Sequence, residues 1–386
     1  MKSRITRTEF AILVCYFLYC LIFIFETTQF DNGELSFYVR LSKYLILAVL
    51  LLSVFWRTEL DYAQVTKLLL YFGISGLIAL KSGRLSDVIL VAAFAYSGIK
   101  LKTSLFINVY ISAVLICSFL VLFGVFTGLY INEFIVESAR GSRFFLGFSY
   151  TTILPNFLFH ALLAYTAKRE KKFNALESLI IIAVNEVLYY YTQTRAVYYE
   201  VILLVLSLWI LDLFPRMFKS KLFGMLCLFA FPVAAFTIIY LSYEYSPSNS
   251  FYQLINRVLS NRLALGNLAI KRYGITAFGS KVEWATGRFG IERFSEYFYV
   301  DSSFLNILIC FGVVTCVYIV FSFGIISWQA YLKNNYCLCL ALLFLALHSL
   351  TDPQLFELRY NPFILLIGHV VFDNSYTILQ PKQWIT

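Results

Sequence analysis

Long apolar runs separated by short polar connections constrain this fold more than any other feature of the sequence. A helix needs roughly 20 apolar residues to cross a bilayer, and fewer where interfacial residues help. Only 14% of the residues are charged, against about a quarter in soluble proteins. We therefore expect an all-α integral membrane protein, a single polytopic domain over residues 1–386. Its twelve expected transmembrane helices are residues 10–26, 41–56, 65–80, 85–99, 104–130, 149–167, 175–191, 196–213, 221–243, 303–327, 336–350 and 361–379.

The distribution of lysine and arginine predicts how these helices are oriented. Cytoplasmic loops carry an excess of both residues. With the N-terminus inside, sixteen of the 31 cations lie in cytoplasmic connections, eight in short outer connections and seven in one long loop. Both termini are then cytoplasmic and the long loop faces outward. Because the cations that produce the net charge of +9 lie beside apolar runs, we expect lipid headgroups and no nucleic acid as partners.

The long loop, residues 244–302, lies between the ninth and tenth expected helices and is interleaved with aromatic residues. It is too long for a simple connection and too apolar for disorder, so we expect it to fold and to function. Apolar residues three, four, seven and eight positions after Phe251 form one helical face, which predicts an amphipathic helix over 251–260 on the outer leaflet. The chain after Lys271 is rich in turn residues and should fold back over the membrane.

The type of cation differs between the two sides. Eleven of the sixteen inner cations are lysine, whereas eleven of the fifteen outer ones are arginine. The planar guanidinium binds phosphate in a bidentate way, whereas lysine serves equally well as a topological anchor. The outer face is therefore suited to a phosphate or diphosphate ligand, with contact to lipid phosphates as the alternative. All eight cysteines lie in apolar runs, so neither disulfides nor a zinc site is expected.

Two candidate sites precede the long loop. Arg140 and Arg143 stand at the outer mouth of the sixth segment, which contains Pro155 and Asn156; an ordinary kink with a polar collar is the alternative. A four-residue turn ends at Arg195 and would hold that cation rigidly at the outer surface. About five residues deeper in the membrane, Glu186 is expected to be a buried carboxylate, with His160 as a candidate partner.

Two more candidate sites lie at and after the end of the loop. Asp301 stands where the chain re-enters the membrane and could be a general base; a helix N-cap is the alternative. His348, near the outer end of the eleventh segment, is followed by Asp352, Glu357 and Arg359 in a second polar cluster. A hydrogen-bonded packing role is the alternative for this histidine, and His369 in the last segment is expected to be structural.

These stretches together resemble the Wzy-type polymerases of O-antigen and capsular polysaccharide repeat units, and more distantly the O-antigen ligases. The pieces that carry the resemblance are Arg143 with Leu146–Gly147–Phe148, Pro155–Asn156, the turn ending at Arg195, the large outer loop with Tyr273–Gly274 and Phe278–Gly279, Asp301 with Gly312, and His348 with Asn361–Pro362. Where the ligases typically carry histidine at the position of Asp301, this chain carries aspartate, which favours a polymerase.

The resemblance implies a fold like the C-type glycosyltransferases in a bacterial cytoplasmic membrane. It implies glycosyl transfer from an undecaprenyl-diphosphate-linked oligosaccharide to another lipid-linked repeat unit, with a flippase and a chain-length regulator as possible partners. Arginines can stabilise a leaving diphosphate without a metal, and neither a metal nor another cofactor is expected. The resemblance implies that Asp301 takes the proton of the acceptor hydroxyl, with His348 as the alternative base, and that Arg195 binds the diphosphate. Further candidates for substrate binding are Arg140, Arg143, Arg272, Arg288 and Arg293.

Two functions from other classes compete with this interpretation. A transporter or flippase for lipid-linked oligosaccharides would have a similar number of spans and a similar charge. It would also be expected to carry charges within several helices, short loops throughout and internal repeats, which are not visible in this sequence. A membrane acyltransferase is a third alternative, without a motif that points to it.

Overall fold

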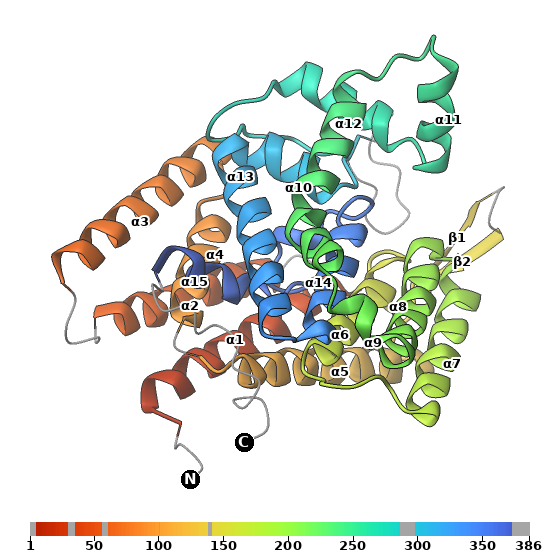
Figure 1. Ribbon diagram of the computed structural model, residues 1–386, viewed down its shortest axis with the longest axis horizontal. Helices are drawn as coiled ribbons and strands as arrows, with labels where there is room; N and C mark the ends of the chain where they lie inside the picture. The colour runs from red at the N-terminus through yellow and green to blue at the C-terminus, as the bar shows by residue number, and fades with distance from the viewer. Residues whose placement is uncertain are drawn as a thin grey trace.

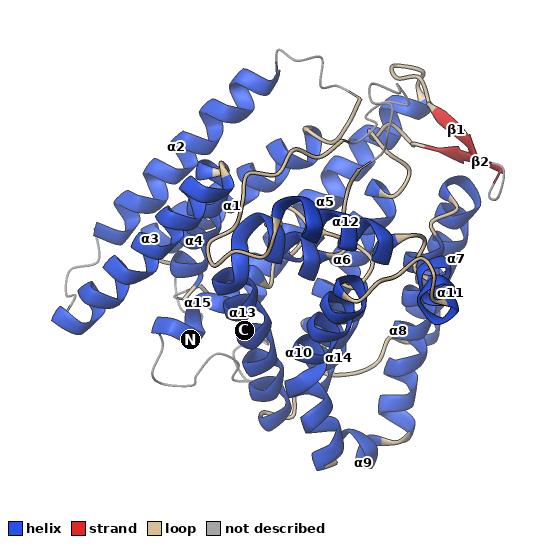
Figure 2. Cartoon of the chain, turned by 90° about the horizontal axis from the view of Figure 1, so that it is seen from above, coloured by secondary structure: helices blue, strands red, loops and turns tan. Residues whose placement is uncertain are grey.

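The computed structural model describes residues 5–29, 35–55, 61–99, 101–137, 141–285 and 298–372, and it is almost entirely helical (Figures 1 and 2). Its elements are α1 (Arg7–Phe25), α2 (Leu35–Phe55), α3 (Tyr62–Ser82), α4 (Leu85–Gly98), α5 (Thr103–Phe126), β1 (Phe134–Glu137), β2 (Gly141–Phe144), α6 (Ile153–Ala167), α7 (Ala175–Thr192), α8 (Arg195–Leu213), α9 (Pro215–Phe218), α10 (Lys221–Tyr243), α11 (Ser250–Val258), α12 (Arg262–Tyr273), α13 (Ser303–Leu332), α14 (Tyr336–His348), the 3-10 helix η1 (Gln354–Phe356) and α15 (Ile364–Phe372).

Each of the twelve segments expected to cross the membrane overlaps a helix, although the last one overlaps only the nine residues of α15, where the described chain ends. Within the described ranges, six helices are long and apolar enough to span a bilayer: α1, α3, α5, α8, α10 and α13. Helices α4, α6 and α14 are apolar but shorter. These helices indicate a membrane protein, as the composition predicted.

Local sequence signals set where several of these helices begin. The Thr6 side chain accepts a hydrogen bond from the Glu9 backbone N–H while the Glu9 carboxylate accepts one from Thr6, which forms a capping box before α1. Asn174 and Glu177 form the same arrangement before α7. Ser220 caps α10 through a bond to the Phe223 N–H. Such caps satisfy backbone donors that a helix start leaves unpaired.

Helix α14 lies at the centre of the bundle, where it contacts α6, α8, α10 and α13 (Figure 1). Nearly all of its side chains are buried. Helices α10 and α13 pack along each other, and Gly324 of α13 faces the Leu228 carbonyl so closely that a Cβ there would collide with it. Several buried polar residues surround the C-terminal end of α14.

Helix α13 is broken at Gly312, which has φ 85° and ψ 174°. Residues of the long loop fill the break: the Ser280 N–H donates to the Ile309 carbonyl at 3.1 Å, and the Val313 N–H donates to the Thr276 carbonyl at 3.0 Å. A Cβ on Gly312 would collide with backbone atoms of Gly279, and one on Gly279 would collide with the Cys310 carbonyl. The loop is therefore attached to the bundle through its backbone, which satisfies polar groups that the helix break frees.

The long loop contains the expected amphipathic helix and a second helix that was not expected. Helix α11 confirms the first, and Phe251, Leu254 and Val258 on its apolar face are exposed. Helix α12 covers residues 262–270, for which no element was predicted, and its last turn enters the stretch after Lys271 where turns were expected. It packs on the end of α10, where Asn267 donates its side-chain N–H groups to the Ser242 and Tyr243 carbonyls at 2.9 and 3.1 Å. Residues 286–297 of the loop lie outside the described ranges.

Candidate functional site

The most unusual feature of the bundle interior is a buried histidine–glutamate pair at the end of α14. His348, the last residue of that helix, places Nδ1 2.7 Å from Oε2 of Glu200 on α8. Both side chains are buried, with 2% and 6% of the residue exposed. Charged groups are rare inside membrane helices and usually mark function, because an unpaired charge there is costly. The pair fixes the orientation of the imidazole ring.

Asp352 lies on the other side of the imidazole. Its Oδ2 is 4.0 Å from His348 Nε2 and accepts a hydrogen bond of 2.8 Å from the Asn156 amide of α6. Burial, opposed by the neighbouring His348, raises the pKa of Asp352 to about 7, and the nearby Asp301 carboxylate acts in the same direction as burial. Near neutral pH this carboxyl group can therefore take up or release a proton.

Several buried polar atoms around this pair lack a hydrogen-bond partner of good geometry. His160 of α6 brings its ring to 5.3 Å from that of His348, centroid to centroid, and Gln354 of η1 lies beside both rings. A buried polar group without a partner costs roughly 1–3 kcal/mol, so native proteins contain few of them. Their concentration here indicates a site that receives a polar ligand or water. Among the described residues the atoms are Asn156 Oδ1, His160 Nδ1 and Nε2, His348 Nε2, Asp352 Oδ1 and Gln354 Oε1.

Arg262 connects this cluster to the long loop. From the start of α12 its Nε donates to the carbonyls of Asp301 and Thr351, at 3.1 and 3.0 Å. Ser303, in the first turn of α13, donates its hydroxyl to the Asp352 carbonyl at 2.6 Å and accepts from the Leu355 N–H. The loop, the start of α13 and the turn after α14 therefore meet at one point, which brings Asp301 and Asp352 together.

Tyr299, just before the loop re-enters the bundle, lies close to several of these carboxylates. Burial raises its pKa well above the usual value for tyrosine, and the charges of Glu357, Asp301 and Asp352 raise it further. Asp301 itself is not the N-cap of α13: Ser302 holds that position, without a side-chain cap bond. The N-cap alternative for Asp301 is therefore wrong.

Arg195 begins α8 on the same helix as Glu200 and is exposed. The two residues are five positions apart, about 7.5 Å along the axis at 1.5 Å per residue. The turn before Arg195 is fixed by Arg143, which is 2% exposed and donates Nε to the Thr192 carbonyl at 2.9 Å. Arg143 also pairs with Glu137 across the β1–β2 hairpin at 2.5 Å, so its guanidinium is occupied in positioning the turn.

The other described arginines that the sequence singled out, Arg272 and Arg359, make contacts of their own. Arg272 lies ten residues after Arg262 on α12, about 15 Å along the axis, with its guanidinium carbon 5.4 Å from the centre of the Phe298 ring. Arg359 forms ion pairs with Glu357 and Glu26 at 2.8 and 3.5 Å. The other candidates, Arg140, Arg288 and Arg293, lie outside the described residues.

The expectation that Glu186 is buried beside His160 is wrong. Helix α7 turns Asn185 toward α8, where its amide donates to the Tyr198 carbonyl at 3.0 Å, and this leaves Glu186 on the outer surface of the helix. There the carboxylate accepts a hydrogen bond of 2.6 Å from the Tyr198 hydroxyl. The carboxylate that is buried in this part of the bundle is Glu200. It was not among the predicted site residues, although an ionisable residue within an apolar run is a signal for such a site.

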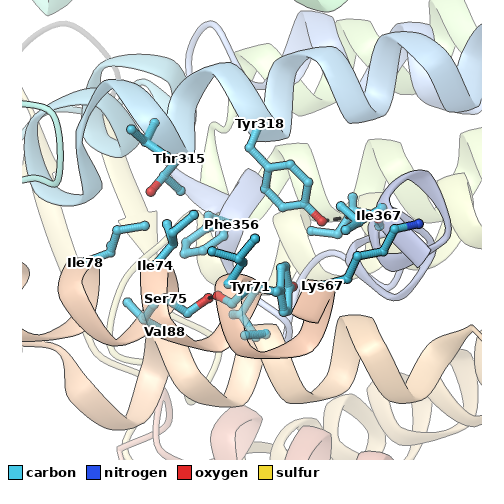
Figure 3. Close-up of a pocket in the computed structure, with 15 residues that line it drawn as sticks. Lys67, Tyr71, Ile74, Ser75, Ile78, Val88, Thr315, Tyr318, Phe356 and Ile367 are labelled. Atoms are coloured by element: carbon cyan, nitrogen blue, oxygen red, sulfur yellow. Dashed lines mark hydrogen bonds between the residues drawn. The ribbon is translucent and has the colours of Figure 1, made fainter. Parts of the chain in front are cut away.

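An apolar cavity of about 310 Å³ lies between α3, α4, α13 and α15 (Figure 3). Three of the hydroxyl groups in its wall donate to backbone carbonyls: Ser75 to Tyr71 at 2.7 Å, Thr315 to Phe311 at 2.8 Å and Tyr318 to Ile367 at 3.2 Å. A cavity with such walls favours hydrocarbon over water. Phe356 of η1 contributes to the wall, so this short helix separates the cavity from the polar cluster around Gln354.

In the described ranges, no group of three or more histidine, cysteine or acidic side chains could hold a metal ion. No protein-family model, no curated protein and no solved structure matches this chain.

Proposed function

We propose that this protein is a polysaccharide polymerase of the bacterial cytoplasmic membrane. The donor is a glycan on undecaprenyl diphosphate, and the acceptor is the hydroxyl at the non-reducing end of a second lipid-linked repeat unit. The reaction takes place at the outer face, on the side of the long loop. The proposal includes about twelve spans, a fold like the C-type glycosyltransferases and both termini in the cytoplasm.

The observation that carries the proposal is the Glu200–His348 pair beneath the long loop. A histidine whose Nδ1 is held by a buried carboxylate has its second nitrogen, Nε2, oriented to accept a proton. Here Nε2 lies in the group of buried polar atoms without partners. This arrangement favours His348 over Asp301 as the base, with Asp301 and Asp352 as neighbouring groups that contact the acceptor sugar.

The proposed step is a displacement at the anomeric carbon of the donor glycan. His348 Nε2 takes the proton of the acceptor hydroxyl as its oxygen forms a bond to that carbon. The bond from the anomeric carbon to the diphosphate oxygen breaks, and its electron pair leaves with the diphosphate. Glu200 stabilises the imidazolium, while an exposed arginine such as Arg195 stabilises the negative charge of the leaving group. No metal takes part.

The apolar cavity supports a lipid-linked substrate. Part of the isoprenoid chain would lie between α3 and α13, while the glycan and the diphosphate would lie beyond η1 toward the loop. Helix α11 would cover the outer opening, with its exposed apolar face in contact with the membrane. Replacing Phe251, Leu254 and Val258 by serine without loss of polymer would contradict this role of α11.

The composition of the membrane fraction tests the proposal against the flippase alternative. Cells that lack the protein should accumulate single repeat units on the lipid at the outer face, because units are delivered but not joined. Loss of a flippase would leave no lipid-linked units outside. His348→Ala should reproduce the deletion, and normal polymer length in both Arg195→Ala and Asp301→Ala cells would show that these two residues are not part of the site.

A further inference from the structure

A second concave site lies at the opposite end of α14 from the polar cluster. It is a pocket of about 610 Å³ between the α6–α7 connection, the end of α8 and the α13–α14 turn. Helix α14 has 13 residues, so the two sites are about 20 Å apart along its axis. The pocket lies at the end of the bundle where lysine predicts the cytoplasmic side. Its cations are Lys168, Arg169, Lys171, Lys172 and Lys333, and its carboxylates are Glu170 and Asp212.

The α6–α7 connection is held in place by Arg169. Its guanidinium donates to both carboxylate oxygens of Glu177, at 2.9 and 3.0 Å, and to the carbonyls of Lys171 and Lys172, at 3.3 and 3.1 Å. Arg169 therefore fixes the loop, and its charge is neutralised by Glu177. The remaining positive charge of the pocket comes from lysines that project from an ordered backbone.

The lysines outnumber the carboxylates that face them. Lys172 pairs with Asp212 at 2.8 Å and lies 3.8 Å from the centre of the Trp209 ring. Among the described residues, the five cations that line the pocket face three carboxylates, namely Glu170, Asp212 and the Glu177 paired with Arg169. Lys171 extends from the exposed surface of the loop.

The start of α14 adds backbone donors to this positive region. Tyr336 and Cys337, the first two residues of the helix, line the pocket. The Asn335 side chain caps the helix by accepting from the Leu338 N–H, and the N–H groups of Tyr336 and Cys337 before it have no acceptor within the helix. N–H groups at a helix start, together with lysine side chains, favour a phosphate group.

Exposed apolar side chains next to the pocket favour a phosphate that belongs to a lipid over a free phosphate ion. Leu213, Phe214 and Met217 are 64%, 61% and 51% exposed, and they flank Pro215, which lines the pocket. Side chains of this kind fit the acyl chains next to a lipid headgroup. We propose that the pocket binds the headgroup of an anionic phospholipid in the leaflet on this side of the membrane. This inference does not depend on the proposed glycosyl transfer.

The test measures lipid retention by the purified full-length protein in neutral detergent, using native mass spectrometry. Phosphatidylglycerol, phosphatidylcholine and inorganic phosphate are added separately. The Lys171→Ala/Lys333→Ala variant removes two pocket cations, and Lys219→Ala is the matched control, because Lys219 is exposed on the neighbouring α9–α10 turn but does not line the pocket.

The proposal predicts that phosphatidylglycerol is retained in preference to phosphatidylcholine. It also predicts roughly tenfold or greater weakening in the double variant and no change in the control. Equal retention of the two lipids, or equal weakening in the control, would overturn it. Binding of inorganic phosphate as tightly as of phosphatidylglycerol would overturn the lipid assignment and identify a site for free phosphate. Circular dichroism of the double variant should match the parent protein.

Discussion

Glu200 gives His348 its defined orientation, and the chemistry proposed here depends on that single contact of 2.7 Å. A carboxylate in this position both selects the tautomer of the ring and stabilises its protonated form. The glutamine side chain has nearly the same shape but carries no charge, so it separates the electrostatic role of Glu200 from its packing role.

We expect Glu200→Gln to lower the rate of glycan transfer by about a hundredfold or more, within the usual range for the loss of general-base assistance. Glu186→Gln is the matched control, because Glu186 is also a glutamate on a membrane helix but lies on the outer surface of α7. The rate of product formation by each purified variant is the measurement. If both variants were equally active, Glu200 would have no role in proton transfer.

Asp352 should make stability depend on pH in a defined direction. Its pKa is raised by burial from 3.8 to about 7, so the folded state binds this proton more tightly than the unfolded state does. Its contribution to stability is then fully present below about pH 4 and is lost as the pH rises toward 7. Asp352→Asn mimics the protonated form and should be free of this loss.

The measurement is the thermal midpoint of Asp352→Asn and of the parent protein from pH 4 to 9. The midpoint of the variant minus that of the parent should grow between about pH 4 and 7 and stay constant above pH 8. A difference that does not change with pH would mean that Asp352 has an ordinary pKa in the folded protein.

Sequence patterns predicted best the helices that are apolar along their whole length or along one regular face. Continuous apolar runs fixed the positions of the membrane helices, and a regular apolar face fixed α11. Helix α12 was missed because Gly266 and Asn267 interrupt any apolar stripe, and because its stability comes from contacts with α10 rather than from local propensity. The break in α13 was hidden within an apolar run, since only the φ of 85° distinguishes Gly312 from an ordinary helical glycine.

The close contact between the break in α13 and the long loop can be tested by adding a side chain at Gly312. Gly312→Ala places a Cβ against backbone atoms of Gly279 and Ala277 and forces alanine to a positive φ. We expect the variant to lose about 2 kcal/mol or more of stability. The loop should also become more sensitive to protease near residues 276–280.

Gly73→Ala is the control for that substitution, since Gly73 lies within α3, and an added Cβ meets no atom within 4 Å. This variant should be as stable as the parent protein or slightly more stable. Thermal unfolding and limited proteolysis measure the two effects. Equal behaviour of the two variants would show that the close approach at Gly312 does not hold the loop.

At the scale of the whole molecule, the candidate site is assembled from α6, α8, α12, α13 and α14, which are far apart in the sequence. Residue types and spacing singled out His348, Asp352 and Asn156 one by one. Spacing placed His348 and Asp352 in one cluster, but it gave no information on which residues of other helices meet them, because that depends on how the helices pack. Glu200 and Arg262 show this most clearly. Glu200 lies in an expected membrane helix and Arg262 in the long loop, and only the packing of the helices brings both to the same cluster.

The most direct test of the account is incubation of the purified protein with synthetic undecaprenyl-diphosphate-linked repeat units, without nucleotide sugar or added metal, followed by separation of the products by size. The account predicts a ladder of longer glycans that is lost in His348→Ala and strongly reduced in Glu200→Gln. No ladder from an authentic substrate would contradict glycosyl transfer and favour a flippase, and an undiminished ladder from His348→Ala would contradict the assignment of the base.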